Sequence, residues 1–455
     1  MNMLTCFKSY DVRGQLGTEL TEGICESIGR AFARVMDPGT VVTGRDIRPS
    51  SAGLQDALHR GLVAEGVQVI DIGLCGTEEV YFATPHHEAG GGLMVTASHN
   101  PMDYNGIKMV RAGARPISAE TGLAEIRALA EAGDFGPDRP GGGVAHRDSR
   151  SAYVAHLMGY LAPQGLRPLK IVVNAGNGTA GPTFDALEAA LDGVPFTYVK
   201  INHSPDGSFP NGIPNPLLPE NRAATAEAVT AHGADMGVAW DGDFDRCFFF
   251  DETGAFVDGE YVVTLLARAF CAKEPGAGIV YDPRVIWSTE DAVRQAGGAP
   301  ILSRVGHSHI KGIMRDRDAA YGGEMSAHHY FRDFNYCDSG MIPWLLLAEL
   351  VARSDRPLSA MLAELRRDYP SSGEVNFRIA DVDAAVSAFE AAYGPQARAE
   401  DRLDGISYDM GDWRVNLRRS NTEPVVRLNI EARGDAVRVA DKLAEIRMLL
   451  SRHAA

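Results

Sequence analysis

The chain has 455 residues, a formal net charge of −16, 45% apolar residues and 23% charged residues. This length predicts roughly three or four domains that each bury a core, and this composition excludes disordered and fibrous classes. The negative charge argues against broad binding to nucleic acid or anionic lipid, because both partners attract clustered Lys and Arg.

The first residues and the cysteines indicate a cytoplasmic protein. Residues 1–14 have neither the basic region nor the apolar stretch of a signal peptide, and no apolar run approaches the roughly 20 residues of a membrane span. The six cysteines are scattered without a C-x-x-C pair, which is typical of free thiols in a reducing compartment. We therefore expect a soluble cytoplasmic protein with no membrane or nucleic-acid partner.

Three stretches, beginning at Thr40, Leu169 and Gly276, repeat one pattern of apolar run, turn, amphipathic segment and second apolar run. The runs of β-branched residues predict buried strands, and Ser, Pro or Thr after the turn predicts a helix start. Each stretch is therefore predicted to be a parallel βαβ unit. In the first unit, Ser50 or Ser51 is expected to cap a helix whose apolar face recurs every fourth residue.

The pattern changes after residue 370, where half-buried strands and a helix near residues 439–450 predict a smaller α+β domain. A Gly-rich stretch around Gly141 and a turn near residue 253 suggest the other boundaries. The expected architecture is three repeated α/β domains with mixed, mostly parallel sheets, followed by the α+β domain. The predicted ranges are 1–147, 148–253, 254–369 and 370–455.

Ser98, His99 and Asn100 stand where an apolar run opens into a polar loop. Ser-His-Asn-Pro is by itself an ordinary turn sequence, and the alternative is that Ser98 is a nucleophile. Ser98 does not lie in a G-x-S-x-G elbow, which argues against a serine hydrolase.

Asp241, Asp243 and Asp245 end another apolar stretch. Three carboxylates this close repel one another unless a cation lies between them, and hard oxygen ligands favour Mg²⁺. An EF-hand loop also begins D-x-D-x-D, but its sixth position requires Gly and is Arg246 here. A solvated acidic turn is disfavoured by the apolar runs on both sides. The sequence therefore predicts a Mg²⁺ site.

A phosphate bound beside this acidic site needs further cations nearby. Arg246 adjoins the cluster, and the other cations beside turns or glycines are Arg13, Lys108, Arg284, His307, Lys311, Arg418, Arg419 and Arg427. Taken singly, each is compatible with an ordinary surface charge. Together they predict a local basic pocket in an acidic chain.

Two later motifs suit a phosphorylated sugar. Glu324, Ser326 and His328 alternate, so they are expected to point from one face of an extended loop, where they suit sugar hydroxyls; a helix-cap or ion-pair role for Glu324 is the alternative. Residues 418–422 form an Arg-Arg-Ser-Asn-Thr loop between predicted strands, able to hold phosphate. A bare hairpin with exposed Arg is the alternative there.

Nucleotide-binding motifs are absent or weak. The chain contains no Gly-Lys dipeptide, which excludes a Walker P-loop. Residues 176–181 match G-x-G-x-x-G, but the following strand ends at Lys200 without an acidic residue to hold a ribose. We interpret this stretch as a tight turn into a Pro-started helix.

In chain order, the motifs SYDVRG, TASHNP with NG-x-K, DGDFDR, GEMSAHH and RRSNTEP resemble those of the α-D-phosphohexomutase family across essentially the whole chain. The resemblance implies a heart-shaped enzyme whose four domains each bring one loop to a central cleft. It implies a hexose phosphate substrate, Mg²⁺, and hexose 1,6-bisphosphate as activator. We expect a monomer or a weak homodimer.

The resemblance also implies roles for the matching residues. Ser98 would carry the phosphoryl group and hold Mg²⁺ together with Asp241, Asp243 and Asp245. The other residues expected at the reaction are His99, Lys108, Arg13, Arg246 and His328. Substrate contacts are expected from Tyr10, Arg284, His307, Glu324, Ser326, His328, Arg418, Ser420, Asn421, Thr422 and Arg427.

The sugar preference is suggested by one loop. GEMSAHHYFRDF is similar to the phosphomannomutases of GDP-mannose and exopolysaccharide pathways, whereas phosphoglucosamine mutases tend towards GEQSGH. Relatives that act on both mannose and glucose have Gly in place of Ala327. We expect interconversion of mannose 6-phosphate and mannose 1-phosphate, with a phosphoglucomutase or a dual-specificity enzyme as alternatives.

In the expected reaction, phosphorylated Ser98 gives its phosphoryl group to the hexose phosphate, and the resulting hexose 1,6-bisphosphate turns over and returns its other phosphate to Ser98. Lys108 or His328 would move the hydroxyl proton, and a hinge is expected between Pro370 and Gly373. One rival is a haloacid-dehalogenase-type phosphatase, which is disfavoured because Asp245 stands where Thr or Val is required. The other rival is a non-catalytic sugar-phosphate-binding relative.

Overall fold

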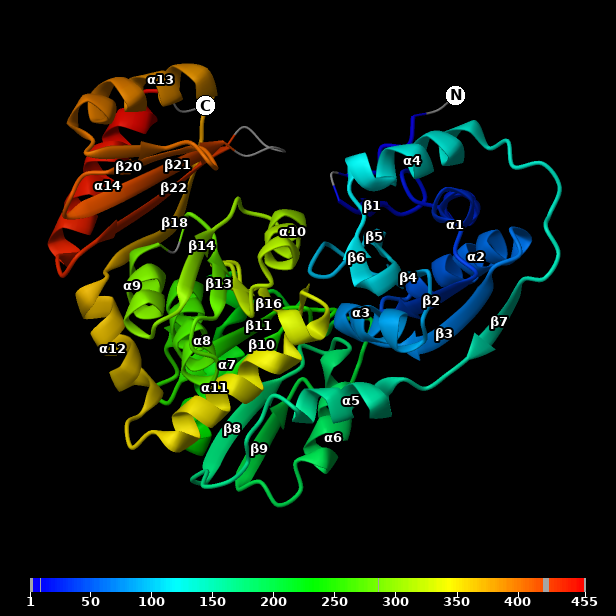
Figure 1. Ribbon diagram of the computed structural model, residues 1–455, viewed down its shortest axis with the longest axis horizontal. Coiled ribbons are helices and arrows are strands. Elements are labelled where there is room, and N and C mark those ends of the chain that lie inside the picture. The colour runs from blue at the N-terminus through cyan, green and yellow to red at the C-terminus, as the bar shows by residue number, and fades with distance from the viewer. Residues whose placement is uncertain (1–2, 9, 285, 420–424, 454–455) are drawn as a thin grey trace. The chain divides into compact units, whose positions relative to one another are not determined.

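The structure is a computed structural model that describes residues 3–8, 10–284, 286–419 and 425–453. The chain forms two compact units. The N-terminal unit comprises Met1–Phe256 and His328–Asp355, and the C-terminal unit comprises Val257–Ala327 and Arg356–Ala455. Figure 1 shows their elements coloured along the chain.

The first sheet of the N-terminal unit has a parallel centre and an antiparallel edge. β2 pairs in parallel with β3 and β4, β3 pairs in parallel with β7, and β5 runs antiparallel to β4 and β1. The strands are β1 (Val12–Gln15), β2 (Thr40–Arg45), β3 (Gln68–Leu74), β4 (Gly91–Val95), β5 (Tyr104–Arg111), β6 (Arg115–Pro116) and β7 (Gly143–His146).

Helices cover both faces of this sheet. Val41 packs in the core that contains α1 (Glu22–Met36), α2 (Ser51–Ala64) and α4 (Leu123–Ala132), whereas Val42 packs in the core that contains α3 (Thr77–His86). Neighbouring residues of β2 are thus buried on opposite faces, as expected for an apolar run in a parallel sheet.

The second sheet has the strand order β12-β11-β10-β8-β9. β8 pairs in parallel with β9 and β10, and β11 runs antiparallel to β10. The strands are β8 (Leu169–Asn174), β9 (Phe196–Ile201), β10 (Met236–Trp240), β11 (Cys247–Asp251) and β12 (Phe256–Val257), and the helices are α5 (Arg150–Met158), α6 (Ala180–Ala190) and α7 (Ala223–His232).

The later segment of the N-terminal unit consists of β16 (His329–Phe331), β17 (Cys337–Asp338) and α11 (Met341–Arg353). The carboxylate of Glu78 accepts hydrogen bonds from the backbone N–H of Gly340 (2.6 Å) and Met341 (3.3 Å). These N–H groups lie at the start of α11, where a helix leaves its amides unpaired. The Trp240 indole donates to the Gly340 carbonyl at 3.0 Å. The segment is therefore tied to both sheets by buried polar contacts.

The C-terminal unit begins with a parallel sheet in which β13 lies between β14 and β15. Its elements are α8 (Gly259–Lys273), β13 (Gly278–Tyr281), α9 (Trp287–Gln295), β14 (Ala299–Leu302), α10 (His307–Arg317), β15 (Tyr321–Gly323) and α12 (Leu358–Asp368).

An antiparallel sheet of order β18-β22-β21-β20-β19 follows, with its core against α13 and α14. The elements are β18 (Ser371–Arg378), α13 (Val382–Tyr393), β19 (Ala399–Asp401), β20 (Ile406–Asp409), β21 (Trp413–Arg419), β22 (Val425–Ala432) and α14 (Ala436–Ser451).

The predicted architecture is confirmed in its main features. The stretches from Thr40, Leu169 and Gly276 each form two parallel strands joined by a helix, and the last part of the chain is α+β. All six cysteines lie in the described part, buried and unbridged. Across the described residues, no helix combines the length and apolar character needed to cross a bilayer.

Two local predictions hold only in part. Ser50 is the N-cap residue of α2, but its side chain makes no capping hydrogen bond; Asn105 donates to the hydroxyls of Ser50 and Ser51, and Ser51 donates to Asp46. The helix after the Gly-rich turn begins at Ala180, ahead of its proline. At Ser50 the tertiary contact with Asn105 takes the place of the capping bond, and in α6 the proline still lies in the first turn, where a helix tolerates it.

Candidate active site

Ser98 lies in the loop between β4 and β5 with a left-handed backbone, φ +50°. This conformation costs an L-residue roughly 1 kcal/mol or more, so surrounding contacts must hold it. The Ser98 N–H donates to Thr96 Oγ1 at 2.8 Å. A Cβ on Gly242 would lie 2.7 Å from the Ser98 carbonyl oxygen, so the loop packs directly on the Asp241–Asp245 turn.

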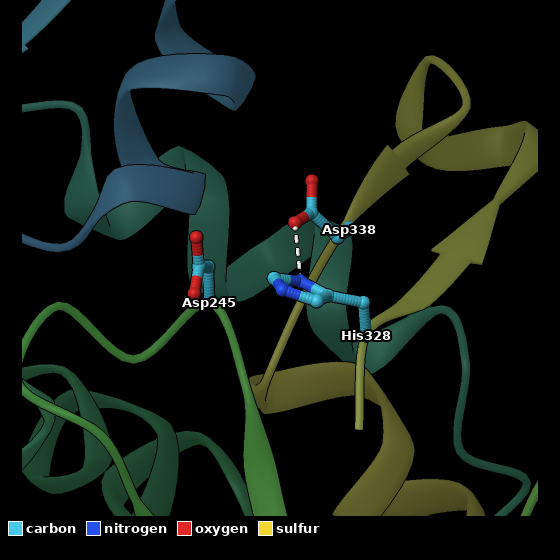
Figure 2. A group of neighbouring side chains, drawn as sticks. All are labelled: Asp245, His328 and Asp338. Atoms are coloured by element: carbon cyan, nitrogen blue, oxygen red, sulfur yellow. Dashed lines mark hydrogen bonds and ion pairs between the residues drawn. The ribbon is translucent and has the colours of Figure 1, made fainter. Parts of the chain in front are cut away.

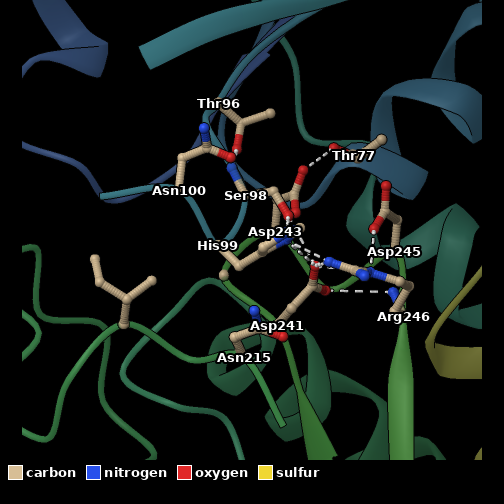
Figure 3. Close-up of polar contacts among 12 residues, drawn as sticks. Thr77, Thr96, Ser98, His99, Asn100, Asn215, Asp241, Asp243, Asp245 and Arg246 are labelled. Carbon is tan, nitrogen blue, oxygen red and sulfur yellow. Dashed lines mark hydrogen bonds and ion pairs between the residues drawn. The ribbon is translucent and has the colours of Figure 1, made fainter. Parts of the chain in front are cut away.

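The Ser98 hydroxyl donates to Asp241 Oδ2 at 2.8 Å and lies 2.9 Å from His99 Nδ1 (Figure 3). Arg246 donates to Asp241 Oδ2 at 2.8 Å and also to His99 Nδ1. Burial and the nearby Arg246 guanidinium lower the pKa of His99 to about 4, so its imidazole is neutral and its Nδ1 accepts. Ser98, His99, Asp241 and Arg246 therefore form one polar group, in which His99 is half-buried and the other three are buried.

The three aspartates converge at the turn between β10 and β11, with one carboxylate oxygen from each within 4.8 Å of the others. All three are buried. Lys108, on β5, places its Nζ 2.7 Å from Asp243 Oδ2 and 2.5 Å from Asp245 Oδ2. The Lys108 ammonium group thus lies against the turn that the sequence predicts as a metal site.

Burial and mutual repulsion shape the charges of these groups. Burial opposes ionisation of Asp241, but the Arg246 guanidinium beside it outweighs burial and lowers the pKa of Asp241 below its usual range. Burial and the neighbouring carboxylates raise the pKa of Asp245 to about 6, even with Lys108 beside it. Burial would lower the pKa of Lys108, but the carboxylates raise it above its usual value. The three carboxylates of the cluster are therefore only partly neutralised by Lys108 and Arg246.

The residues present fit Mg²⁺. Asp243 Oδ2 accepts from Thr77 Oγ1 at 2.6 Å and from Lys108, whereas Asp243 Oδ1 is buried and has no hydrogen-bond partner among the described residues. A buried carboxylate oxygen without a partner is costly. A hard cation that binds oxygen would satisfy it.

His328 lies near this cluster from another segment of the same unit (Figure 2). Its Nδ1 is 2.9 Å from Asp338 Oδ2, and its ring lies between Asp338 and Asp245, with one ligand atom of each residue within 4.8 Å of the others. Burial opposes protonation of His328, but Asp338 and Asp245 outweigh it and raise the pKa.

Arg13 completes the set around Ser98. From β1 it donates to Asn100 Oδ1 at 2.9 Å and to Asp11 at 2.8 Å. Tyr10 lies half-buried just before this strand.

A second group of predicted residues meets in the C-terminal unit around Arg284. Its guanidinium donates to Asp282 at 3.0 and 2.6 Å and to Glu324 at 3.0 Å. It also lies 3.4 Å from the Ser326 hydroxyl. Burial opposes the charge, but Asp282 outweighs it and raises the pKa of Arg284 above its usual value.

The Glu374 carboxylate lies close to three arginines of this group. Its carboxylate is 2.5 Å from Arg418, 3.6 Å from Arg427 and 3.6 Å from Arg284. These three predicted cations are therefore balanced by a carboxylate, and the predicted cations Arg13, Lys108 and Arg246 lie in the N-terminal unit instead.

The other predicted residues are placed as follows. His307 is the first residue of α10, and Lys311 is buried on that helix. Arg419 pairs with the exposed Asp383. Ser420, Asn421 and Thr422 lie outside the described residues. The chain passes from one unit to the other between Ala327 and His328, so the alternating Glu324, Ser326 and His328 belong to different units.

Sequence reasoning missed Thr77, Asp338, Asp282 and Glu374. Thr77 lies 166 positions from Asp243, so no spacing links them, and Asp338 stands ten positions after His328, a spacing that matches no motif. Asp282 stands two residues before Arg284, in the sequence Asp-Pro-Arg. That short spacing, which allows the backbone and side chain of Arg284 to reach one carboxylate, is the one available signal.

The chain is similar to known proteins along its whole length. Residues 5–137, 151–254, 258–369 and 374–449 match, in order, domains I, II, III and the C-terminal domain of the family described as phosphoglucomutase/phosphomannomutase. A phosphomannomutase of Salmonella montevideo is 56% identical over 455 residues, which cover 99% of this chain and 100% of that protein. A protein of Xanthomonas campestris named phosphohexose mutases is 56% identical over 447 residues, covering 98% and 99%.

Among solved structures, a phosphoglucomutase/phosphomannomutase family protein of Burkholderia thailandensis superposes with a TM-score of 0.88 at 33% identity, covering 100% of this chain and 99% of that one. Sequence, domain order and three-dimensional structure agree over the full length. The chain therefore belongs to the phosphoglucomutase/phosphomannomutase family.

Proposed function

We propose that this protein is a phosphomannomutase that interconverts mannose 6-phosphate and mannose 1-phosphate, with Ser98 as the phosphoryl carrier. The observation that carries the proposal is the Ser98 hydroxyl, hydrogen-bonded at 2.8 Å to Asp241 within the three-aspartate cluster. The relatives named phosphomannomutase, 56% identical over nearly the whole chain, support mannose as the sugar.

In the proposed reaction, the bond between phosphorus and the Ser98 oxygen breaks as a bond forms to a free hydroxyl of the hexose monophosphate. The attacking hydroxyl loses its proton and the freed Ser98 oxygen takes one up, so the products are a hexose 1,6-bisphosphate and an unphosphorylated Ser98. After the intermediate turns over, its other phosphoryl group returns to the Ser98 oxygen, which loses its proton. The sugar oxygen released in that step takes up a proton and becomes a hydroxyl.

The charged residues of the N-terminal unit would make this transfer possible. Asp241, Asp243 and Asp245, together with Ser98, would hold Mg²⁺. When bound, Mg²⁺ supplies positive charge to the transferring phosphoryl group, which is the main requirement of such a reaction. Arg246, Arg13 and His99 orient the group at Ser98. Lys108 and His328 remain the two candidates for moving the hydroxyl proton.

The Arg284 group of the C-terminal unit would bind the rest of the substrate. Glu324 and Ser326 offer acceptors and a donor to sugar hydroxyls, and the guanidinium groups of Arg284, Arg418 and Arg427 suit a phosphate. A phosphate there would compete with Glu374 for these cations. We assign Tyr10, His307, Ser420, Asn421 and Thr422 to substrate binding in the same proposal.

The remaining parts of the proposal concern setting and assembly. We propose a cytoplasmic monomer or weak homodimer that requires hexose 1,6-bisphosphate as activator, built from domains 1–147, 148–253, 254–369 and 370–455. Size-exclusion chromatography with light scattering tests the assembly, and omission of the bisphosphate from the assay tests the activator.

The deciding experiment compares wild-type protein with Ser98→Ala in an assay with mannose 1-phosphate and a trace of bisphosphate. Wild-type protein is expected to turn over, and phosphopeptide mass spectrometry is expected to find phosphate on Ser98. The variant should lose turnover while keeping its melting temperature. Wild-type turnover by Ser98→Ala would disprove the covalent mechanism, and faster turnover of glucose 1-phosphate would favour a dual-specificity enzyme or a phosphoglucomutase.

A further inference from the structure

Arg48 lies buried beside the loop that carries Ser98. It follows β2 and is only 3% exposed. Its guanidinium donates to the carbonyl oxygens of Ser98 at 3.0 Å, Asn100 at 2.5 Å, Pro101 at 2.8 Å and Tyr104 at 3.3 Å. One side chain thus binds the backbone of the whole loop from residue 98 to residue 104.

This pattern requires a guanidinium. Arginine presents several N–H donors in a rigid plane, so it can bind acceptors on two sides at once. A lysine ammonium is a compact charge with three donors around a single atom. Because the carbonyl oxygens are divided between Nη1 and Nη2 of Arg48, one ammonium cannot replace all four contacts.

Residues near the end of β2 also hold the Arg48 guanidinium in place. Asp46 lies 3.6 Å from Arg48 Nε and accepts from the Arg48 backbone N–H at 2.9 Å. Asp46 also accepts from the Ser51 hydroxyl. The Phe209 ring lies 5.8 Å from the guanidinium carbon. Arg48 is therefore a fixed part of the sheet edge rather than a mobile surface cation.

The contact with the Ser98 carbonyl bears on the position of the Ser98 hydroxyl. The left-handed φ of Ser98 is unfavourable for a residue with a side chain, and rotating the following peptide would move the carbonyl away from Arg48. Gly242 packs against the same carbonyl oxygen. Thr96, Ser98 and Asn100 are seen together in Figure 3, with the hydroxyl turned towards Asp241.

We propose that Arg48 is a positioning residue, which fixes the backbone of residues 98–104 so that the Ser98 hydroxyl faces Asp241 and His99. This inference rests on the proposed role of Ser98 as phosphoryl carrier. Arg48 acts through the loop: its donors bind backbone carbonyl oxygens, and the reacting hydroxyl is bound by other residues.

Arg48→Lys and Arg48→Ala test the proposal, with Arg222→Lys as the matched control. Arg222 also donates from its guanidinium to backbone carbonyls of the N-terminal unit, those of Pro216 at 2.9 Å and Leu217 at 2.7 Å. Misplacement of a reacting group by about 1 Å can cost about 100-fold in rate. We therefore expect the kcat of Arg48→Lys to fall about 10- to 100-fold with KM within about twofold, and Arg222→Lys to retain both.

Chemical rescue separates positioning from general damage. Methylguanidinium should restore part of the kcat of Arg48→Ala, and methylammonium should not, because only the former presents a planar set of donors. Should Arg48→Ala fail to fold, Arg48→Lys still decides the question. Equal losses of kcat in Arg48→Lys and Arg222→Lys, or an Arg48→Lys variant with wild-type kcat, would overturn the proposal.

Hydrogen exchange of the loop provides a readout that does not depend on turnover. The amides of Ser98, Asn100 and Tyr104 are hydrogen-bonded within the loop, and Arg48→Lys should speed exchange in residues 98–104 while Arg222→Lys leaves it unchanged. Unchanged exchange in Arg48→Lys contradicts the proposal. Turnover by Ser98→Ala would instead refute the proposed function, so the two failures are distinguishable.

Discussion

Substitution of Thr77 tests whether its hydrogen bond orients the Asp243 carboxylate for binding a cation. Its hydroxyl donates to Asp243 Oδ2 at 2.6 Å, and its backbone N–H donates to the Asp243 carbonyl at 3.0 Å. Thr77→Val removes the first bond and keeps both the second bond and the side-chain shape. Asp243 would then be held by Lys108 alone on that oxygen, and its free Oδ1 would no longer be fixed in direction.

The expected loss follows from the strength of that bond. A hydrogen bond to a charged group contributes about 1.5–3 kcal/mol, and each 1.4 kcal/mol is about tenfold in an equilibrium constant. Loss of a hydrogen-bond partner behind a metal ligand typically weakens metal affinity about 10- to 100-fold. We expect Thr77→Val to weaken divalent-metal binding by about 10- to 100-fold.

The measurement is titration with Mn²⁺, followed by electron paramagnetic resonance, and with Mg²⁺, followed by calorimetry. Thr77→Ser should restore the wild-type affinity because it returns the hydroxyl. Thr84→Val is the matched control, since Thr84 is equally buried on α3 but donates to the Val80 carbonyl. Wild-type affinity in Thr77→Val, or an equal loss in Thr84→Val, would refute the reasoning.

Three further predictions concern stability and substrate binding. Burial raises the pKa of Glu260 from 4.5 to about 7. The folded protein therefore holds the Glu260 proton more tightly than the unfolded chain does. The stabilisation from this proton is complete below about pH 4.5 and is lost as the pH rises to about 7, which lowers the free energy of unfolding by about 3 kcal/mol. Glu260→Gln should raise Tm relative to wild type more at about pH 8 than at about pH 5, and equal differences at both would contradict this. Gly340→Ala would place a Cβ 2.4 Å from the Phe244 carbonyl oxygen. This clash should lower the free energy of unfolding by about 1–3 kcal/mol and lower Tm. Gly39→Ala is the control, because its Cβ would meet open space, and it should leave Tm unchanged. Arg284→Lys keeps the charge but loses the paired bonds to Asp282, so steady-state kinetics should show KM for the hexose phosphate raised about tenfold with a smaller change in kcat; an unchanged KM would contradict the role assigned to Arg284.

The sequence predicts the strands and turns that bring Ser98 and the aspartates together. The apolar runs before Ser98 and Asp241 become β4 and β10, and the two residues meet across 143 positions. Hydrophobic periodicity predicts each strand and the polar turn at its end. It does not predict that the two turns meet, because β4 and β10 belong to different sheets.

The contacts that complete the site depend on tertiary structure. Thr77 and Asp243 are 166 positions apart, and a Thr or an Asp in a sequence does not indicate which distant residue it will contact. Similarly, a count of cations predicts the basic residues around Arg284 but not that Glu374 neutralises them. The local rule predicts Ser50 as the N-cap residue of α2 but not the partner of its hydroxyl, which accepts from Asn105.

The discontinuous path of the N-terminal unit has a consequence for biosynthesis. Trp240 and its partner Gly340 are separated by 100 positions, and residues 257–327 of the other unit are made between them. At about 5–20 residues per second, roughly 5–20 seconds pass on the ribosome before the indole of Trp240 can reach the Gly340 carbonyl, and the Glu78 carboxylate, 262 positions from Gly340, waits longer. The nascent N-terminal half therefore lacks the Gly340 contacts of Trp240 and Glu78, and the strand that leads into the aspartate turn acquires its final support only after most of the polypeptide has been made.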